Sequence, residues 1–182
     1  FRINQLTNRP SKELIQSFAE IPVANIGDGV NRTFCMQSRI RPYNRVPLVG
    51  TAFTVKARPG DNLMLNKAID MAEPGDVIVV DGGGELSNAL IGEMMITWAN
   101  NRNLAGCIVD GAVSDADDIS EMTIPVYAAG VSPAGSYKAG PGETNVPISC
   151  GGVAIHPGDI VAGDSDGVVV HLFNDAHVVL DK

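Results

Sequence analysis

Apolar and polar residues alternate along the N-terminal part of the chain in patterns that predict two helices and a strand. Residues 11–19 place apolar side chains on one face of a short helix that begins after Ser11, a residue type favoured as an N-cap. Residues 61–72 have the same periodicity behind Asp61, which is expected to cap a second helix. The apolar segment 49–55 between them is typical of a strand.

Two short runs in the middle of the chain are apolar at every position, which is typical of strands buried on both faces. They are residues 77–80 and 106–109, and a helix over about 92–101 separates them. The order strand, helix, strand predicts a parallel pair joined by a right-handed crossover.

Beyond Ile124 the pattern changes to short β segments separated by turns rich in Gly, Pro and Asp. The segments are residues 125–128, 146–149 and 168–170. No stretch is long or polar enough to link two domains, so we expect residues 1–182 to form one domain. Its expected architecture is an α/β or α+β fold in layers around a mixed sheet.

Composition and charge narrow the class of protein. The 182 residues are 45% hydrophobic and 19% charged, and no apolar run approaches the about 20 residues of a membrane span. Residues 1–5 lack the pattern of a signal peptide, so we expect a soluble, cytoplasmic protein with no membrane partner. A formal net charge of −8 repels phosphate backbones and argues against direct nucleic-acid binding, while a protein partner stays open.

Cysteine and histidine form no obvious metal-binding or catalytic pattern. The three cysteines are far apart in the sequence and are expected to be reduced. His156, His171 and His177 are not at the spacing of metal ligands, and we expect them at surface or edge positions.

Chemistry-bearing residues follow the two buried strands. Ligands of open α/β sheets gather beyond the carboxyl ends of parallel strands, where residues 81–84 and 110–115 are expected to lie side by side. The helix that begins at Gly92–Met95 has free backbone N–H groups that favour a carboxylate or a phosphate. Asp115 and Glu93 supply hard oxygen ligands suited to Mg²⁺ or Mn²⁺.

Each of these features also has a purely structural interpretation. Asp115 is equally suited to cap a helix over 117–119, and Glu93 in a first helical turn is favoured by the helix dipole alone. The glycines at 82–84 match neither a dinucleotide fingerprint nor a phosphate-binding loop, so we expect them to allow a tight turn and close backbone packing.

Several runs of the sequence, taken in order, resemble the family named after regulator of ribonuclease activity A, which also contains 4-hydroxy-4-methyl-2-oxoglutarate aldolase. The likeness extends over roughly residues 21–172. The runs that carry it are residues 48–55, 59–62, 74–84, 89–93, 105–113, 145–147 and 157–164.

The resemblance implies a swivelling β/β/α-type fold, assembled as a homotrimer or a hexamer with active sites between neighbouring subunits. Catalytic members of the family cleave or decarboxylate small 2-oxo acids with a divalent metal. In them an acidic residue is followed, after twenty intervening residues, by an Arg-Asp pair. The Asp holds the metal, the Arg binds the substrate's oxygens, the acid orients waters around the metal, and the amides after that acid hold the pyruvate carboxylate.

Placed on this chain, the acid corresponds to Glu93, the amides to Met94 and Met95, and the metal-binding Asp to Asp115. The Arg corresponds to Ser114, whose hydroxyl lacks the fixed charge and two-pronged grip of a guanidinium. Charged hydrogen bonds contribute about 1.5 to 3 kcal/mol each, so the resemblance implies weakened or retargeted catalysis.

The resemblance implies a second difference at the C-terminus. Catalytic relatives continue into a helix that lends an acidic residue to the neighbour's metal site, whereas this chain ends at Asp181–Lys182, so an incomplete ligand shell is expected. Arg102 is not expected to replace the missing Arg, because the family already has an Arg at that position.

Three functions are compatible with the sequence. The leading hypothesis is a metal-dependent lyase of the pyruvate class, acting as an aldolase on a 4-hydroxy-2-oxo acid or as an oxaloacetate decarboxylase. The main alternative is a non-catalytic regulator that inhibits a ribonuclease through protein contacts. The third is an active enzyme of this fold whose substrate does not need the Arg.

Overall fold

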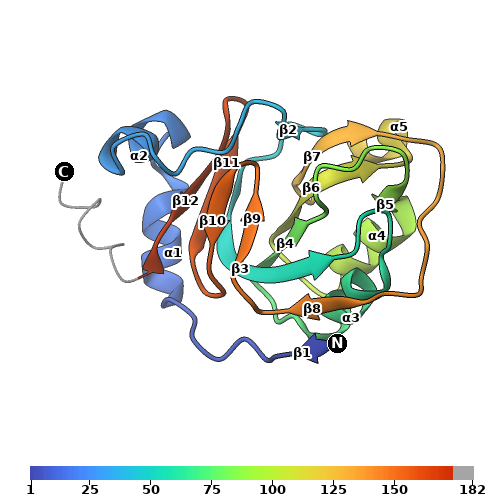
Figure 1. Cartoon of the computed structure of the whole chain (residues 1–182). Coiled ribbons are helices and arrows are strands. Elements are labelled where there is room, and N and C mark those ends of the chain that lie inside the picture. Colours follow the sequence, from blue (N-terminus) through green and yellow to red (C-terminus); the bar gives the residue numbers. More distant parts are fainter. Residues whose placement is uncertain (174–182) are drawn as a thin grey trace.

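A large mixed β-sheet forms the centre of the molecule, with α3, α4 and α5 at one side of it and α1 and α2 at the other (Figure 1). The computed structural model describes residues 1–173. The helices are α1 Lys12–Ala19, α2 Val23–Gly29, α3 Leu63–Met71, α4 Glu93–Asn101 and α5 Ala116–Ser120. The strands are β1 Arg2–Ile3, β2 Arg41–Pro42, β3 Leu48–Ala57, β4 Asp76–Asp81, β5 Ala89–Ile91, β6 Gly106–Val113, β7 Val126–Val131, β8 Gly142–Thr144, β9 Ile148–Cys150, β10 Val153–Ile155, β11 Ile160–Asp164 and β12 Gly167–His171.

Four neighbouring strands of the sheet, β3, β4, β6 and β7, run parallel. The predicted parallel pair over 77–80 and 106–109 is therefore confirmed, and Asp81 lies opposite Asp110 in its register. Antiparallel strands complete the sheet, because β8 and β11 both pair with β3 and β12 pairs with β11. The predicted α/β fold with a mixed sheet is confirmed.

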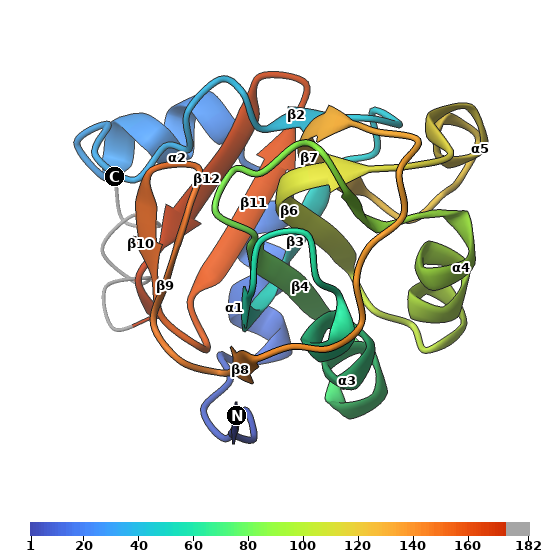
Figure 2. The ribbon, with the colours of Figure 1, turned by 45° about the vertical axis from the view of Figure 1, so that its right-hand side comes forward.

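The sheet is covered on both faces, which explains why β4 is apolar at successive positions. Ile78 and Val80 pack with the apolar residues of α3 and α4, whereas Val77 and Val79 face a second cluster that includes residues of β9 and β10. Successive side chains of a strand point to opposite faces, so a strand with both faces buried has no polar position in its interior. Figure 2 shows β9 and β10 on one side of β4 and α3 and α4 on the other.

The N-terminal helix has the predicted bounds, and the Oγ atom of Ser11 accepts a hydrogen bond from the Leu14 N–H at 3.1 Å. Gly82 also behaves as expected, because a Cβ there would lie 2.7 Å from the Asp110 carbonyl oxygen, and only a glycine allows this approach.

Three expectations about elements and burial need correction. Helix α3 begins two residues later than predicted, at Leu63, and strand β6 continues to Val113 because β5 provides it with a partner strand there. His171, expected at a surface or edge position, lies on β12, which pairs with β11 alone among the described strands, but it is 2% exposed and its ring packs on Phe18 at a centroid distance of 5.3 Å. The sequence could not reveal this, because α1 and β12 come together only in the folded chain.

Some expectations concern residues outside the described part of the chain. His177 and the C-terminal end at 181–182 lie there. Within residues 1–173, none of the helices has both the length and the apolar character that crossing a membrane requires.

Candidate active site

The turn after β6 and the first turn of α4 meet at one end of the sheet. Strand β5 runs parallel to the last residues of β6, so the chain leaves the two strands side by side, at Gly92 and at Ser114. The Ser114 N–H donates a hydrogen bond to the Ile91 carbonyl at 3.0 Å and extends this pairing by one residue. The structure thus brings together the two turns that the sequence placed in one neighbourhood.

Asp115 connects these two turns directly. Its Oδ2 atom accepts a hydrogen bond from the backbone N–H of Glu93 at 3.0 Å. Asp115 also occupies the N-cap position of α5, but its side chain makes no capping hydrogen bond to that helix. Its backbone is in the left-handed region, with φ 59°, which is uncommon for a residue other than glycine but is adopted by Asp and Asn more readily than by most. The helix-cap interpretation therefore explains the position of Asp115 before α5. It does not explain why the carboxylate bonds the Glu93 N–H and no N–H group of α5.

Gly92 allows the two turns to approach each other. A Cβ atom at this position would lie 2.6 Å from the Oγ of Ser114 and 2.7 Å from Oδ2 of Asp115. Real Cβ atoms essentially never show such short contacts, so a side chain would push the two turns apart.

We expect Gly92→Ala to weaken both the Asp115 contact and any ligand binding that depends on it. Overpacking of a tight contact costs about 1–3 kcal/mol, which predicts a fall in the midpoint of urea unfolding and a loss of about 10-fold or more in affinity for a 2-oxo acid. Gly135→Ala is the control for the unfolding midpoint only, because a Cβ there meets no atom within 4 Å although the residue lines the hollow. Equal falls in the unfolding midpoint for the two variants would contradict the steric argument.

The side chain of Glu93 is directed along its own helix. Its Oε1 atom accepts a hydrogen bond from the Thr97 hydroxyl at 3.1 Å, and the residue is half-buried. Glu93 and Asp115 are therefore joined through a backbone N–H and not by a contact between their two carboxylates.

Met94 has an 82% exposed side chain, so we expect it to contact a substrate through its backbone N–H alone. The N–H groups of Met94 and Met95 belong to the first turn of α4, where helical N–H groups have no acceptor within the helix.

A hollow of about 240 Å³ lies beside the two turns. Three of the predicted residues line it, namely Gly92, Met95 and Ser114, whereas Glu93, Met94 and Asp115 do not. The remaining lining residues are Asn62, Ala89, Leu90, Ile91, Gly135, Ser136 and Lys138. The volume suits a small acid, and its lining combines apolar strand residues with a few polar groups, as ligand sites commonly do.

Sequence analysis missed three polar residues of this hollow, Asn62, Ser136 and Lys138. Asn62 is buried, and its Nδ2 atom donates to the Leu90 carbonyl at 3.1 Å. Ser136 and Lys138 lie between β7 and β8, a segment for which the sequence predicted no role. Among the described residues that line the hollow, Lys138 is the only one with a positive charge.

The side chains of this site offer a divalent cation few protein ligands. Asp115 has a second carboxylate oxygen, Oδ1, for which no hydrogen bond is found among residues 1–173. In the same part of the chain, no three His, Cys, Asp or Glu side chains are placed to hold a metal ion together. Mg²⁺ is commonly held by one or two carboxylates while it keeps several waters, so Asp115 suits this cation but not a dry, many-liganded site.

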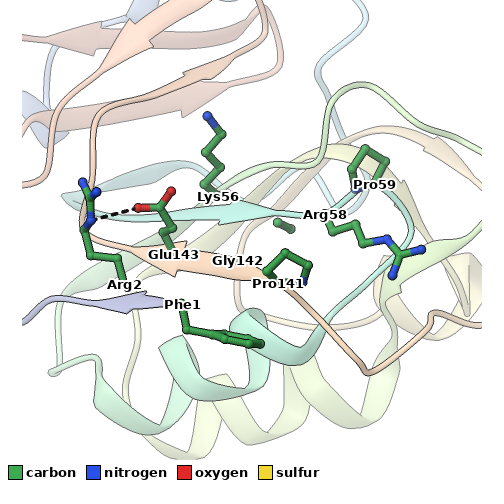
Figure 3. Close-up of a pocket in the computed structure, with 9 residues that line it drawn as sticks. Phe1, Arg2, Lys56, Arg58, Pro59, Pro141, Gly142 and Glu143 are labelled. Carbon is green, nitrogen blue, oxygen red and sulfur yellow. Dashed lines mark ion pairs between the residues drawn. The ribbon is translucent and has the colours of Figure 1, made fainter.

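Arg102, Lys56 and Arg58 do not line this hollow. The Nη2 atom of Arg102 donates to the Ala72 carbonyl at 3.0 Å, so Arg102 closes the C-terminal end of α3. A larger hollow of about 440 Å³ is lined by Lys56 and Arg58, but these two side chains point in different directions (Figure 3). Among the described residues, no helix start lines that hollow, and its one acid, Glu143, is paired with Arg2 at 3.4 Å, so we assign the candidate chemistry to the smaller one.

Comparison with known proteins defines the family. The sequence model of the RraA-like family, described as Aldolase/RraA, matches residues 23–170. A protein of Halalkalibacterium halodurans, named "Putative 4-hydroxy-4-methyl-2-oxoglutarate aldolase", is 42% identical over 171 residues, which are 93% of this chain and 81% of that protein. The chain therefore belongs to the Aldolase/RraA family, as its sequence motifs indicated.

Two solved structures are similar to the fold. One is the RNA-processing inhibitor RraA from Thermus thermophilis, with a TM-score of 0.77 and 29% identity over 84% of this chain and 93% of that one. The other is RraAS2 of Streptomyces coelicolor, titled an unusual member of the RNase ES inhibitor RraA protein family. It has a TM-score of 0.87 and 27% identity over 96% of this chain and 92% of that one. The family thus includes proteins named as aldolases and proteins named as inhibitors.

Proposed function

We propose that this protein is a divalent-metal-dependent lyase of the pyruvate class, which cleaves a 4-hydroxy-2-oxo acid or decarboxylates oxaloacetate. The observation that carries the proposal is the contact of the Asp115 carboxylate with the first turn of α4, beside a hollow lined by Ser114. A metal-binding acid and a carboxylate-binding helix start are then available to one small substrate. The 42% identical relative named as an aldolase supports the same reading.

The proposed roles follow from the donor types. Asp115 would hold Mg²⁺ or Mn²⁺, which would supply Lewis-acid polarisation of a 2-oxo group. The N–H groups of Met94 and Met95, with Gly92 leaving the approach open, bind the substrate carboxylate at the positive end of the helix dipole. Glu93 orients water beside the cation, and Ser114 donates one neutral hydrogen bond to a substrate oxygen.

Lys138 supplies positive charge at the hollow, which the hydroxyl of Ser114 cannot provide. Lys138 is exposed and lines the same hollow as Ser114 and Gly92. We propose that it binds an oxygen of the anionic substrate, so that part of the charge lost with the family Arg is restored from another segment of the chain.

Lys138→Met is expected to raise KM for a 2-oxo acid about tenfold, the effect of losing one charge-assisted hydrogen bond of about 1.5 kcal/mol. Steady-state kinetics at several substrate concentrations measure this change. Lys12→Met is the control, since Lys12 is an exposed residue of α1 and lies outside the lining of the hollow. An unchanged KM in Lys138→Met would remove Lys138 from the site.

The direct test of the proposed function is pyruvate release from oxaloacetate and from 4-hydroxy-4-methyl-2-oxoglutarate. The native protein is assayed with Mg²⁺, with Mn²⁺ and with excess chelator. Turnover that requires the added metal supports the lyase. Turnover at the same rate in chelator, or none with any 2-oxo acid, would contradict it.

We also propose that the protein acts in the cytoplasm as a homotrimer or hexamer with sites between subunits. Three large apolar side chains near the hollow support a covering partner copy: Leu86 is 46% exposed, Val131 51% and Tyr137 64%. Tyr137 lies between two residues that line the hollow, Ser136 and Lys138. Light scattering distinguishes a trimer or hexamer from a monomer, and a monomeric mass would contradict this part of the proposal.

A second candidate function is inhibition of a ribonuclease by protein contact. Ser114 in place of the family Arg favours it, as does the similarity of the fold to an RNA-processing inhibitor and to a member of an RNase inhibitor family. An assay of a purified ribonuclease with and without this protein tests it directly.

A further inference from the structure

The segment between β7 and β8, residues 132–141, extends alongside the candidate site, and we call it the strap. In Figure 2 it is the orange segment that runs from β7 past α4 and α3 to β8. It has no regular secondary structure over most of its length, yet three of its residues, Gly135, Ser136 and Lys138, line the hollow. The position of Lys138 therefore depends on what holds the strap in place.

One attachment lies on the β7 side of Lys138. The Nδ2 atom of Asn88 donates to the Gly135 carbonyl at 2.7 Å, and the Ala89 N–H donates to the Ala134 carbonyl at 2.7 Å. These contacts fix the strap before it reaches Ser136.

The second attachment lies on the β8 side and centres on Asp61. Oδ2 of Asp61 accepts hydrogen bonds from the backbone N–H groups of Ala139 at 2.7 Å and Gly140 at 2.8 Å. Its other oxygen, Oδ1, accepts from the Leu63 N–H at 3.0 Å, at the start of α3. A single carboxylate thus ties the strap to α3 immediately after Lys138.

Backbone contacts of the neighbours of Asp61 reinforce this attachment. The Tyr137 N–H donates to the Gly60 carbonyl at 2.8 Å, and the Asn62 N–H donates to the Tyr137 carbonyl at 2.9 Å. The residue before Lys138 and the two residues after it are therefore all bonded to 60–62. Asn62 itself lines the hollow, so the segment 60–62 both holds the strap and forms part of the wall of the site.

Asp61 is well suited to act as an ionised acceptor. It is 2% exposed, and burial alone would raise the pKa of its carboxyl group. The N–H groups of Leu63, Ala139 and Gly140, together with the positive charge of Arg58, outweigh burial and lower the pKa below its ordinary value. The carboxylate therefore stays charged at neutral pH and accepts hydrogen bonds strongly.

We propose that Asp61 is a positioning residue, which holds the strap so that Lys138 reaches the substrate, although Asp61 touches no substrate itself. This inference rests on the proposed function, since it assigns the Asp61 carboxylate a part in binding an anionic substrate. Asp61→Asn keeps the shape of the side chain, but it replaces one acceptor oxygen with an NH₂ group. Whichever way the amide is turned, its NH₂ group faces a backbone N–H donor, of Leu63 or of Ala139 and Gly140, so the tie between α3 and the strap is broken.

The test is a double-mutant cycle that uses oxalate, a planar dianion resembling a 2-oxo carboxylate, as the probe. Calorimetry in Mg²⁺ measures oxalate affinity for the native protein, Asp61→Asn, Lys138→Met and the double variant. We expect Asp61→Asn to weaken binding about tenfold in the native background and less than about twofold when Lys138 is already Met. Equal losses in the two backgrounds would show that Asp61 does not act through Lys138.

Asp76→Asn is the matched control for general destabilisation. Asp76 is another buried aspartate, 1% exposed, and it accepts hydrogen bonds from Arg9 at 2.8 and 2.9 Å, away from the strap. It is expected to lower the unfolding temperature while oxalate affinity stays within about twofold of native. A tenfold loss of affinity in Asp76→Asn would assign the Asp61 effect to stability alone.

Hydrogen exchange provides a readout that needs neither substrate nor metal. Peptides covering 137–140 are expected to exchange faster in Asp61→Asn than in native protein, with peptides of β4 unchanged.

If Asp61→Asn fails to fold, Asn88→Ala releases the other attachment at a partly exposed residue and enters the same cycle. If native protein binds no oxalate and releases no pyruvate, the proposed function fails; if it does both and the cycle is additive, only the role of Asp61 fails.

Discussion

Asp115→Asn is expected to abolish metal-dependent pyruvate release, with a fall of more than about 100-fold in kcat/KM. Loss of an outer-shell partner of a metal ligand costs about 10- to 100-fold in metal affinity or activity, and loss of a direct carboxylate ligand exceeds that range. The Asn side chain still accepts the Glu93 N–H through its amide oxygen, so the turn keeps its position while the charge is lost.

Two measurements distinguish this effect from misfolding. The unfolding temperature of Asp115→Asn should stay near the native value, and titration with Mn²⁺ should show that metal affinity falls together with activity. Asp117→Asn is the matched control, an exposed aspartate in the first turn of α5. Pyruvate release unaffected by Asp115→Asn would invalidate the site assignment.

Ser114→Arg is expected to raise kcat/KM by roughly 10- to 150-fold. This range corresponds to one charged hydrogen bond of about 1.5 to 3 kcal/mol made in the transition state, at about 1.4 kcal/mol per tenfold change. Ser114 lines a hollow of about 240 Å³, which leaves room for a longer side chain. In the free protein the nearby Lys138 repels the guanidinium group that Ser114→Arg introduces. The gain in kcat/KM should therefore require an anionic substrate.

Ser114→Met is the control, because it adds bulk without charge and should not raise kcat/KM. An inert native protein that gains activity in Ser114→Arg would identify a decayed site and favour the ribonuclease regulator. A Ser114→Arg variant with no gain, in a native protein that turns over, would indicate that Lys138 already supplies the needed charge.

The fold was predictable where burial imposes a strict pattern. Strand β4 lies between two apolar clusters, so its sequence has no polar residue between Asp76 and Asp81 and could be recognised without homologues. Helix α2 escaped prediction because its seven residues include two glycines, which give it weak intrinsic helix propensity. Tertiary packing forms this helix, with Ile26 fully buried.

The candidate site was only partly predictable, for a similar reason. The turn at Ser114 follows a predicted strand, whereas the turn at Gly92 follows β5, a three-residue strand that the sequence did not predict and that pairs with the end of β6. Lys138 lies in irregular chain, and its place beside Ser114 depends on hydrogen bonds to residues about 50 and 78 positions earlier in the sequence, at Asn88 and Asp61. No local pattern encodes such long-range contacts. The roles of Glu93, Asp115 and the other site residues remain predictions.

The pairing of β3 has a consequence for the order in which the protein can assemble. This strand bonds β4 close by in sequence, but also β8 near residue 143 and β11 near residue 161. Contacts between distant parts of a chain slow folding, because long loops must close before the contacts form. During synthesis, β3 keeps an open edge until β8 and β11 have left the ribosome, and the nascent chain is exposed to edge-to-edge aggregation for that interval.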